Sequence, residues 1–321
     1  MADGAVGALR VAVLGCGRMG RAHVDAIRSI GGKLDLVVCD PSPVAREWAA
    51  ATNLRAFSDL EGALSAGELD AVVIAAITSS HAELVAAALD RGIAVLCEKP
   101  GGTSPSALRE LGRSADAQGR VLRLAYWHRF VPALRRVRDA AGDGAFGDVL
   151  GLSSAQWDGE PPTAAFLAGS GGELVDMGVH EIDFARWALG EELRARGAAW
   201  RSDPSGHNAA VGVLQSDGGT VVTVSAGRVL EGGRDGCWLE VLGTRASTFD
   251  RWLWGDEGES VTRRAVRDQD RAFLELAAGH PSSDLASAED GAAVLALANA
   301  LTDAATDTAA LPVADPGSLP V

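Results

Sequence analysis

The stretch Leu9-Arg10-Val11-Ala12-Val13-Leu14-Gly15-Cys16-Gly17-Arg18-Met19-Gly20 decides the fold of this chain. Its first six residues are mostly apolar, as in a buried strand, and a helix-like segment follows from Met19 to Ile30. The glycines between them match the G-x-G-x-x-G pattern of a dinucleotide-binding turn. Gly15 permits the tight turn, Gly17 lets the backbone approach a pyrophosphate, and Gly20 lets the helix lie close to the strand. The stretch therefore predicts a strand, a turn and a helix whose N-terminus binds phosphate.

A carboxylate in the right place supports this interpretation. Asp40 directly follows the next apolar segment, Leu34–Cys39, and lies 20 residues after Gly20. There a carboxylate binds the ribose 2′-hydroxyl of NAD and repels the 2′-phosphate of NADP. Pro41 and Ser42 add no cation, so we expect NAD, with NADP less favoured. The alternative is a simple tight turn followed by an acid that leads a helix.

The rest of the N-terminal half repeats the alternation of strand and helix. Ala71–Ile77, Ile93–Cys97 and Val121–Tyr126 are apolar segments, and Ala82–Leu89 between the first two has the pattern of a helix. Short apolar strands separated by helices indicate a parallel sheet covered on both faces. We therefore predict a doubly wound, α/β Rossmann domain over residues 1–125.

The rhythm changes after residue 125. Val211–Gln215 and Thr220–Ala226 flank Ser216-Asp217-Gly218-Gly219, which is typical of a hairpin. Further strands are predicted at Asp148–Trp157, Trp238–Leu242 and Ala246–Trp252. Helices are predicted at Pro132–Ala141, Leu174–Leu189, Ala265–Gly279 and Leu285–Thr308. Residues 126–321 should form an α+β domain with a mostly antiparallel open sheet. We expect this second domain to bind the substrate.

Composition excludes several classes of function. The apolar fraction is 47% and the net charge is −14, so a globular protein that repels nucleic acid and anionic membranes is expected. No apolar segment reaches the ~20 residues that a membrane helix needs. The four cysteines lack the spacing of a metal site and are expected to be buried thiols in the cytoplasm: Cys16, Cys39, Cys97 and Cys237.

Lysine is rare in this chain, which has only Lys33 and Lys99. Arginine is used wherever a general positive charge suffices. Arginine does not lose its proton near neutral pH and is too broad to act as a compact point charge. A lysine in a special place therefore indicates that the chemistry requires an ammonium group.

Three further motifs suggest a family. Glu98-Lys99-Pro100 follows the fifth predicted strand, and Thr78-Ser79-Ser80-His81 follows the fourth. The third motif is Gly171-Gly172-Glu173-Leu174-Val175-Asp176-Met177-Gly178-Val179-His180-Glu181-Ile182-Asp183. Together with the glycine turn, these segments resemble the glucose-fructose oxidoreductase / inositol dehydrogenase / MocA family. The residues of the third motif are most similar to those of inositol dehydrogenases. The resemblance implies association into a homo-oligomer, a dimer or a homotetramer, through the second-domain sheet.

The motifs also predict the cofactor contacts, which are Gly15, Gly17, Arg18, Met19, Gly20, Asp40, Thr78, Ser79, His81, Glu98 and Lys99. Two features depart from the family pattern. Ser79 and Ser80 stand where the family often has Pro-Asn, so contacts to the nicotinamide ribose should differ. Tyr126 is the only tyrosine, although tyrosines are common in the second domain of the family.

Oxidation of a secondary alcohol needs a base, a cation for the developing alkoxide and a nicotinamide. On one continuous helix Asp176, His180 and Asp183 would share a face. We predict His180 as general acid and base, because its ordinary pKa is near 6.5. Lys99 should stabilise the alkoxide, while Asp176 orients the imidazole or binds the adjacent hydroxyl. The resemblance implies the same roles.

Plainer interpretations exist for each residue. Asp176 and His180 could be a surface pair of small energetic value, and Lys99 could cap a helix. Asp176, His180, Asp183 and Glu173 are potential metal ligands, but without a second cluster we expect no metal. The predicted substrate contacts are Lys99, Trp127, His128, Trp157, Asp158, Asp176, His180 and Asp183.

The sequence thus predicts an NAD-dependent dehydrogenase that interconverts a secondary ring hydroxyl and a ketone on a cyclitol or sugar. Two alternatives stay open. One is a biosynthetic reductase of a keto-sugar or aminocyclitol within the same family. The other is a regulatory protein that binds NAD without turnover, since fold alone does not prove catalysis.

Overall fold

The computed structural model describes residues 8–159, 170–202, 208–228, 236–253, 261–282 and 284–307. They form two compact units, each drawn from separate parts of the chain. The first takes the described residues of Met1–Ala145, Ile182–Gly190 and Trp254–Ala296. The second takes those of Phe146–Glu181, Glu191–Leu253 and Leu297–Val321. The sequence did not predict that two later stretches of the chain belong to the first unit. The predicted domain boundary after residue 125 stays a prediction.

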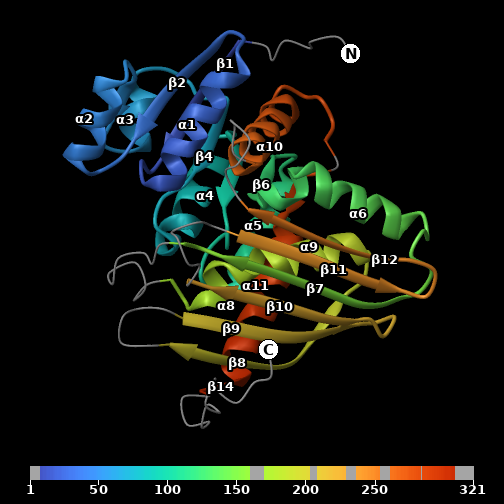
Figure 1. Ribbon diagram of the computed structural model, residues 1–321. Coiled ribbons are helices and arrows are strands. Elements are labelled where there is room, and N and C mark those ends of the chain that lie inside the picture. The colour runs from blue at the N-terminus through green and yellow to red at the C-terminus, as the bar shows by residue number, and fades with distance from the viewer. Residues whose placement is uncertain are drawn as a thin grey trace. The chain divides into compact units, whose positions relative to one another are not determined.

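Sheet A organises the first unit (Figure 1). Its strand order is β13 (Ala286–Ser287), β6 (Leu122–Ala125), β5 (Ala94–Glu98), β4 (Ala71–Ile74), β1 (Leu9–Leu14), β2 (Leu34–Cys39) and β3 (Arg55–Phe57). The first six strands in the chain pair in parallel, and the short β13 adds an antiparallel edge beside β6. The predicted doubly wound sheet is confirmed, and the carboxyl ends of its strands form one edge where ligands bind in such folds.

Helices cover this sheet, and their sequences explain where they form. The described helices that lie wholly in the first unit are α1 (Arg18–Ile30), α2 (Pro43–Ala51), α3 (Leu60–Ser65), α4 (His81–Leu89), α5 (Pro105–Ala117), α6 (Pro132–Gly142) and α10 (Val261–Ala277). Three of them, α2, α5 and α6, have proline in their first turn, where no backbone donor is lost. Figure 1 shows α2 and α3 beside the β2–β3 edge, and α1 packs against α10. All residues of β4 and β5 are buried, as expected for strands covered on both faces.

Sheet B organises the second unit. Its order is β12 (Ser247–Leu253), β11 (Gly236–Gly243), β7 (Val149–Trp157), β10 (Val221–Gly227), β9 (Asn208–Ser216), β8 (Leu193–Ser202) and β14 (Ala305–Asp307). The predicted hairpin joins β9 to β10, with Val221 opposite Gln215. Most pairs are antiparallel, but β7 runs parallel to β10 and β14 parallel to β8. The prediction of a mostly antiparallel sheet is therefore confirmed.

The structure corrects one predicted helix near the candidate site. We expected one helix over Leu174–Leu189, but the chain forms α8 (Glu173–Asp176) and then α9 (Gly178–Leu189). Met177 between them has φ −107° and ψ −50°. Gly178 favours such an interruption because glycine is a poor helix former. The spacing of Asp176, His180 and Asp183 therefore does not place the three on one helix face.

Other elements differ more in extent than in kind. The last predicted helix, Leu285–Thr308, is α11 (Ala288–Ala304), with β13 before it and β14 after it. Strands β3 and β8 and helices α2, α3 and α5 had not been assigned from the sequence. None of the helices in the described ranges is both long and apolar enough to cross a membrane. The four cysteines are free and buried, as predicted.

Candidate active site

The glycine turn has the geometry that its sequence predicts. Gly15 has φ +96°, and a Cβ added there would lie 2.7 Å from the carbonyl oxygen of Ala75. A Cβ on Gly20 would lie 1.9 Å from the carbonyl oxygen of Gly15, so only glycine allows α1 to start here. A Cβ on Gly17 would meet no atom of the described chain within 4 Å. Packing within the described chain therefore does not require Gly17, and its predicted role in the approach of a dinucleotide stays a prediction.

Asp40 connects this turn to the neighbouring strand. Its two carboxylate oxygens accept hydrogen bonds from the backbone N–H groups of Cys16 (2.7 Å) and Ser42 (2.8 Å). The Arg46 guanidinium donates to the carbonyl oxygens of Asp40 (2.7 Å) and Pro41 (2.8 Å). Asp40 therefore holds the turn in place, and its carboxylate lies at the edge where the adenosine ribose is expected. Arg46 is a nearby cation that the sequence analysis had not considered.

The segment after β4 is a short 3-10 helix, η1 (Thr78–Ser80), which leads into α4. His81 is buried, and its Nε2 donates to the carbonyl oxygen of Ala76 at 3.0 Å. Burial lowers the pKa of His81, so the ring is neutral. His81 shapes the loop in this structure, and its cofactor contact, like those of Thr78 and Ser79, stays a prediction. Ile77 before η1 is 72% exposed.

Lys99 follows β5 directly, and the residue before it is part of a buried ionic cluster. Glu98 Oε1 accepts from His23 Nε2 at 3.0 Å, and Glu98 Oε2 accepts from the Lys99 backbone N–H at 3.2 Å. The other nitrogen of that ring, Nδ1, lies 2.9 and 2.8 Å from the two carboxylate oxygens of Asp270. Lys99 precedes Pro100 through a cis peptide bond. Lys99, the predicted cation, therefore lies on a turn whose backbone is held by Glu98 of the buried cluster.

The second unit contains a different cluster, around Asp176. Arg228, just after β10, is fully buried and binds Glu173 at 2.6 Å through Nη1 and Asp176 at 2.5 Å through Nη2. Glu173 and Asp176 begin and end α8, and each side chain is 15% exposed. Asp176 is therefore an anchored carboxylate rather than a mobile surface acid.

His180 lies in the first turn of α9 and is 3% exposed. Its backbone N–H donates to the carbonyl oxygen of Met177 at 3.1 Å. The next residue, Glu181, is fully buried and contacts the hydroxyl of Ser154 on β7. Burial raises the pKa of Glu181 to about 8, so its neutral acid form is favoured near neutral pH. The acid/base role of His180 stays a prediction.

Asp183 has an ion-pair partner that the sequence did not reveal. Its carboxylate is fully buried and forms a two-point ion pair with Arg129, with Nη2 at 2.6 Å from Oδ1 and Nε at 2.8 Å from Oδ2. Arg129 belongs to η2 (Trp127–Phe130), so this pair ties η2 to α9. The predicted substrate contact of Asp183 stays a prediction.

The other predicted substrate contacts divide by exposure. Trp127 is 5% exposed and packs edge-on against His128, with ring centroids 4.3 Å apart. Burial lowers the pKa of His128 to about 3, so that ring is neutral. Trp157 and Asp158 at the end of β7 are half-buried, and the backbone N–H of Asp158 donates to Gly227 at 3.0 Å. All four substrate contacts stay predictions. The half-buried Trp157 and Asp158 are more accessible to a ligand than the buried Trp127 and His128.

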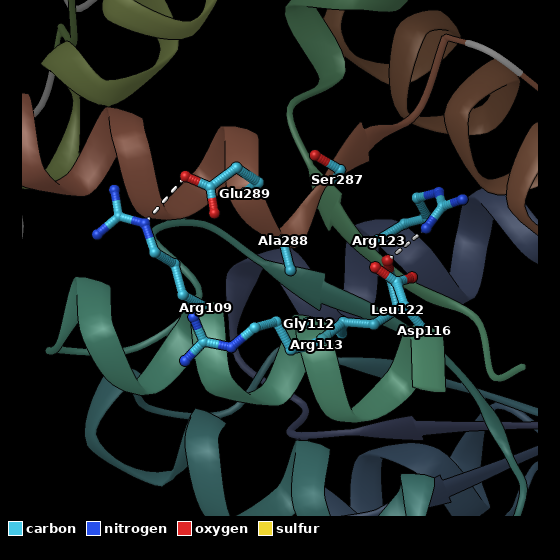
Figure 2. A pocket seen from close by; sticks show the side chains of 9 residues that line it. All are labelled: Arg109, Gly112, Arg113, Asp116, Leu122, Arg123, Ser287, Ala288 and Glu289. Atoms are coloured by element: carbon cyan, nitrogen blue, oxygen red, sulfur yellow. Dashed lines mark hydrogen bonds and ion pairs between the residues drawn. The ribbon is translucent and has the colours of Figure 1, made fainter. Parts of the chain in front are cut away.

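A hollow elsewhere in the first unit has a different character (Figure 2). Arg109 and Arg113 of α5 and Arg123 of β6 line it, with Glu289 from the first turn of α11. Arg109 pairs with Glu289 at 2.9 Å, Arg113 pairs with Glu110, and Arg123 donates to a carbonyl at 2.8 Å. Local groups thus satisfy these arginines.

No group of three histidine, cysteine or acidic side chains in the described part of the chain could hold a metal ion.

The sequence analysis missed four residues of these clusters. They are His23, Asp270, Arg228 and Arg46. Each is a polar or charged residue on a helix or at a strand end, and 247 residues separate His23 from Asp270. Local pattern contains no signal for such pairs. The one available indication is that His23 and Asp270 each occupy the buried side of an amphipathic helix.

The parallel sheet, the glycine turn and Asp40 define a class, the NAD-binding oxidoreductases with a Rossmann domain. A family model described as an oxidoreductase family with an NAD-binding Rossmann fold matches residues 9–126. A second, for the GFO/IDH/MocA C-terminal domain, matches residues 134–249. The chain belongs to this family of NAD-dependent oxidoreductases, as the motifs had indicated.

Individual relatives extend over nearly the whole chain. The rhizopine catabolism protein MocA of Rhizobium meliloti is 34% identical over 92% of this chain and 94% of its own length. The myo-inositol dehydrogenase Hyg17 of Streptomyces leeuwenhoekii is 32% identical over 87% and 91%. The crystal structure of GenD2 from gentamicin A biosynthesis in complex with NAD has a TM-score of 0.83 at 24% identity and covers 93% and 94%. The likeness to GenD2 shows the fold.

Proposed function

We propose that this protein oxidises or regenerates one secondary ring hydroxyl of an inositol-like cyclitol or a sugar, with a ketone as the other form. The observation that carries the proposal is the position of Lys99, one of two lysines, directly after β5 at the ligand-binding edge of the NAD-binding sheet. The relatives support the substrate class, because one is named a myo-inositol dehydrogenase and another a rhizopine catabolism protein.

The chain's own residues divide the work between binding and proton transfer. The turn from Gly15 to Gly20 and Asp40 hold the cofactor, and bound NAD supplies the acceptor or donor of hydride. Lys99 stabilises negative charge on the reacting oxygen, which a compact ammonium does better than a guanidinium. His180 takes the hydroxyl proton in oxidation and returns it in reduction. Asp176, anchored by Arg228, binds a neighbouring hydroxyl or orients His180.

The test is absorbance of reduced nicotinamide with NAD or NADP against myo-inositol, scyllo-inositol, glucose, galactose and aminocyclitols. Lys99→Met should abolish turnover, and His180→Ala should lower it by about 10²–10⁴-fold, the usual contribution of a general acid or base. Lys33→Met is the matched control, because Lys33 is exposed and is the only other lysine. No turnover on any polyol or its ketone, with NAD bound, would favour the regulatory alternative. Faster reduction than oxidation would favour the biosynthetic reductase.

One face of sheet B supports self-association. Val211, Val221, Leu242 and Phe249 are 43–66% exposed, and the register places all four on the same face. Apolar side chains gathered on one exposed face are typical of an interface. We propose that a second copy of this chain covers this face in a dimer or tetramer. Light scattering should show an oligomer that Phe249→Glu weakens, and a monomer at micromolar concentration would contradict it.

A further inference from the structure

Three ionisable side chains from three separate elements meet beneath the Lys99 turn. His23 comes from the buried side of α1, Glu98 from the end of β5 and Asp270 from the buried side of α10. His23 and Asp270 are fully buried, and the Glu98 side chain is 6% exposed. We call these three residues the sealed cluster. A cluster of this kind is expensive for stability alone, because buried ion pairs often gain nothing over apolar residues of similar size.

The geometry favours a charged histidine. Both ring nitrogens face carboxylate oxygens, at 3.0 Å for Glu98 and 2.8 Å for Asp270. A neutral imidazole has a single N–H, so its other nitrogen would direct a lone pair at a carboxylate. Only the imidazolium donates on both sides. The Gln269 amide is a further donor to Asp270, at 3.4 Å. Burial alone would lower the pKa of His23, but the two carboxylates outweigh it and raise that pKa to about 10.

The position of Glu98 gives the cluster a consequence for the site. One carboxylate oxygen of Glu98 accepts from His23, and the other accepts from the backbone N–H of Lys99. We propose that the His23 imidazolium is a positioning residue, which fixes the Glu98 carboxylate and through it the Lys99 backbone from which the ammonium extends. Asp270 completes the arrangement by holding His23 from the opposite side. The inference rests on the proposed function insofar as Lys99 serves the reaction.

The two-lysine composition allows a direct test that needs no substrate. Incorporation of ¹⁵N-lysine into the full chain labels two lysine amides, those of Lys99 and the exposed Lys33. The Lys99 amide donates to Glu98, so its proton resonance reports that hydrogen bond. His23→Gln and Asp270→Asn should each move the Lys99 cross-peak upfield and leave that of Lys33 in place. His280→Gln, at an exposed histidine, should move neither.

Kinetics then separates positioning from a general loss of stability. In folded His23→Gln, kcat should fall by about 10- to 100-fold, the scale expected when a reacting group is displaced by ~1 Å. The NAD dissociation constant should change less than kcat, because the glycine turn and Asp40 are untouched. The double variant His23→Gln/Asp270→Asn replaces the ionic contacts with neutral hydrogen bonds and should regain thermal stability. Its kcat should stay low, because no cation faces Glu98.

Three results would overturn the inference. The first is an unmoved Lys99 cross-peak in folded His23→Gln. The second is an unmoved cross-peak in Asp270→Asn, which decides the matter alone if His23→Gln does not fold. The third is a double variant whose kcat equals that of the unaltered protein. If the unaltered protein turns over no polyol, the proposed function fails, and the lysine spectra still decide whether His23 positions Lys99.

Discussion

Two ionic clusters in this protein have the same arrangement of charges but differ in their exposure to solvent. Each places two carboxylates around one cation, and each includes or adjoins a predicted catalytic residue. In the sealed cluster the cation is His23, and none of the three side chains is more than 6% exposed. In the open cluster, formed by Glu173, Asp176 and Arg228, the cation is buried but each carboxylate is 15% exposed.

The difference concerns which charges can change. Arginine keeps its proton at any pH a protein survives, so the cation of the open cluster does not change, and its two carboxylates are partly exposed to water. Histidine can lose its proton, so His23 in the sealed cluster stays charged only because two carboxylates raise its pKa. The open cluster therefore suits contact with a polar ligand, and the sealed one suits support of a neighbouring turn. The predictions below test that contrast, starting with the largest effect.

Replacing His23 by leucine should cause the largest loss of stability. Glu98 and Asp270 would be left facing each other in a region that water does not reach. Removing one partner of a buried ion pair typically costs about 3–5 kcal/mol of unfolding free energy. Urea denaturation followed by circular dichroism measures this cost. His280→Leu is the exposed control, and equal midpoints for the two variants would refute the sealed character of the cluster.

Replacing Arg228 by methionine should cost less. The carboxylates of Glu173 and Asp176 are partly exposed and can regain water when the guanidinium is removed. The expected loss is about 1–3 kcal/mol, the range for unsatisfied polar groups. Arg194→Met is the control, because Arg194 forms an exposed pair with Asp217 on the same sheet. A loss for Arg228→Met as large as that for His23→Leu would show that the two clusters are equally sealed.

The fold was predictable wherever local pattern determines it. The strand and glycine turn at Leu9–Gly20 and the hairpin at Ser216–Gly219 depend on residues close in sequence, and both formed as expected. The break at Met177 was not predictable, because the apolar pattern of Leu174–Leu189 continues across it. Strand β13 was missed because two residues contain no periodicity, and only pairing with β6 makes them a strand.

The site was predictable only in part, for the same physical reason. Lys99 stood out because lysine is rare, and Asp40 stood out because its distance from Gly20 has a known meaning. The cations that hold the carboxylates, His23 and Arg228, did not stand out. Their partners are brought to them by tertiary packing, over 55 residues for Arg228 and Glu173. A histidine on a helix has no local feature that reveals two distant carboxylates.

The clusters should also differ in their response to alkali. The pKa of His23 is raised in the folded state from 6.5 to about 10, so its contribution is fully present below about pH 6.5 and is lost as the pH rises through 10. The unfolding free energy should therefore fall across this window, by at most about 1.4 kcal/mol per pH unit. His23→Gln should flatten the curve, and Arg228→Met should retain it. Parallel curves for both variants would mean that His23 is neutral in the folded protein.

Glu181 should give the smallest effect, in a more acidic window. Burial raises its pKa from 4.5 to about 8, so the folded protein favours the protonated acid. That contribution is present below about pH 4.5 and is lost as the pH rises to about 8. Glu181→Gln keeps the shape and cannot ionise, so its stability advantage over the unaltered protein should grow across this window. The slope is at most about 1.4 kcal/mol per pH unit, and donation from Ser154 to the ionised form shortens the pH window and so reduces the total effect. Glu192→Gln, at an exposed carboxylate, should show no such trend, and a trend in both variants would mean that burial of Glu181 is not its cause.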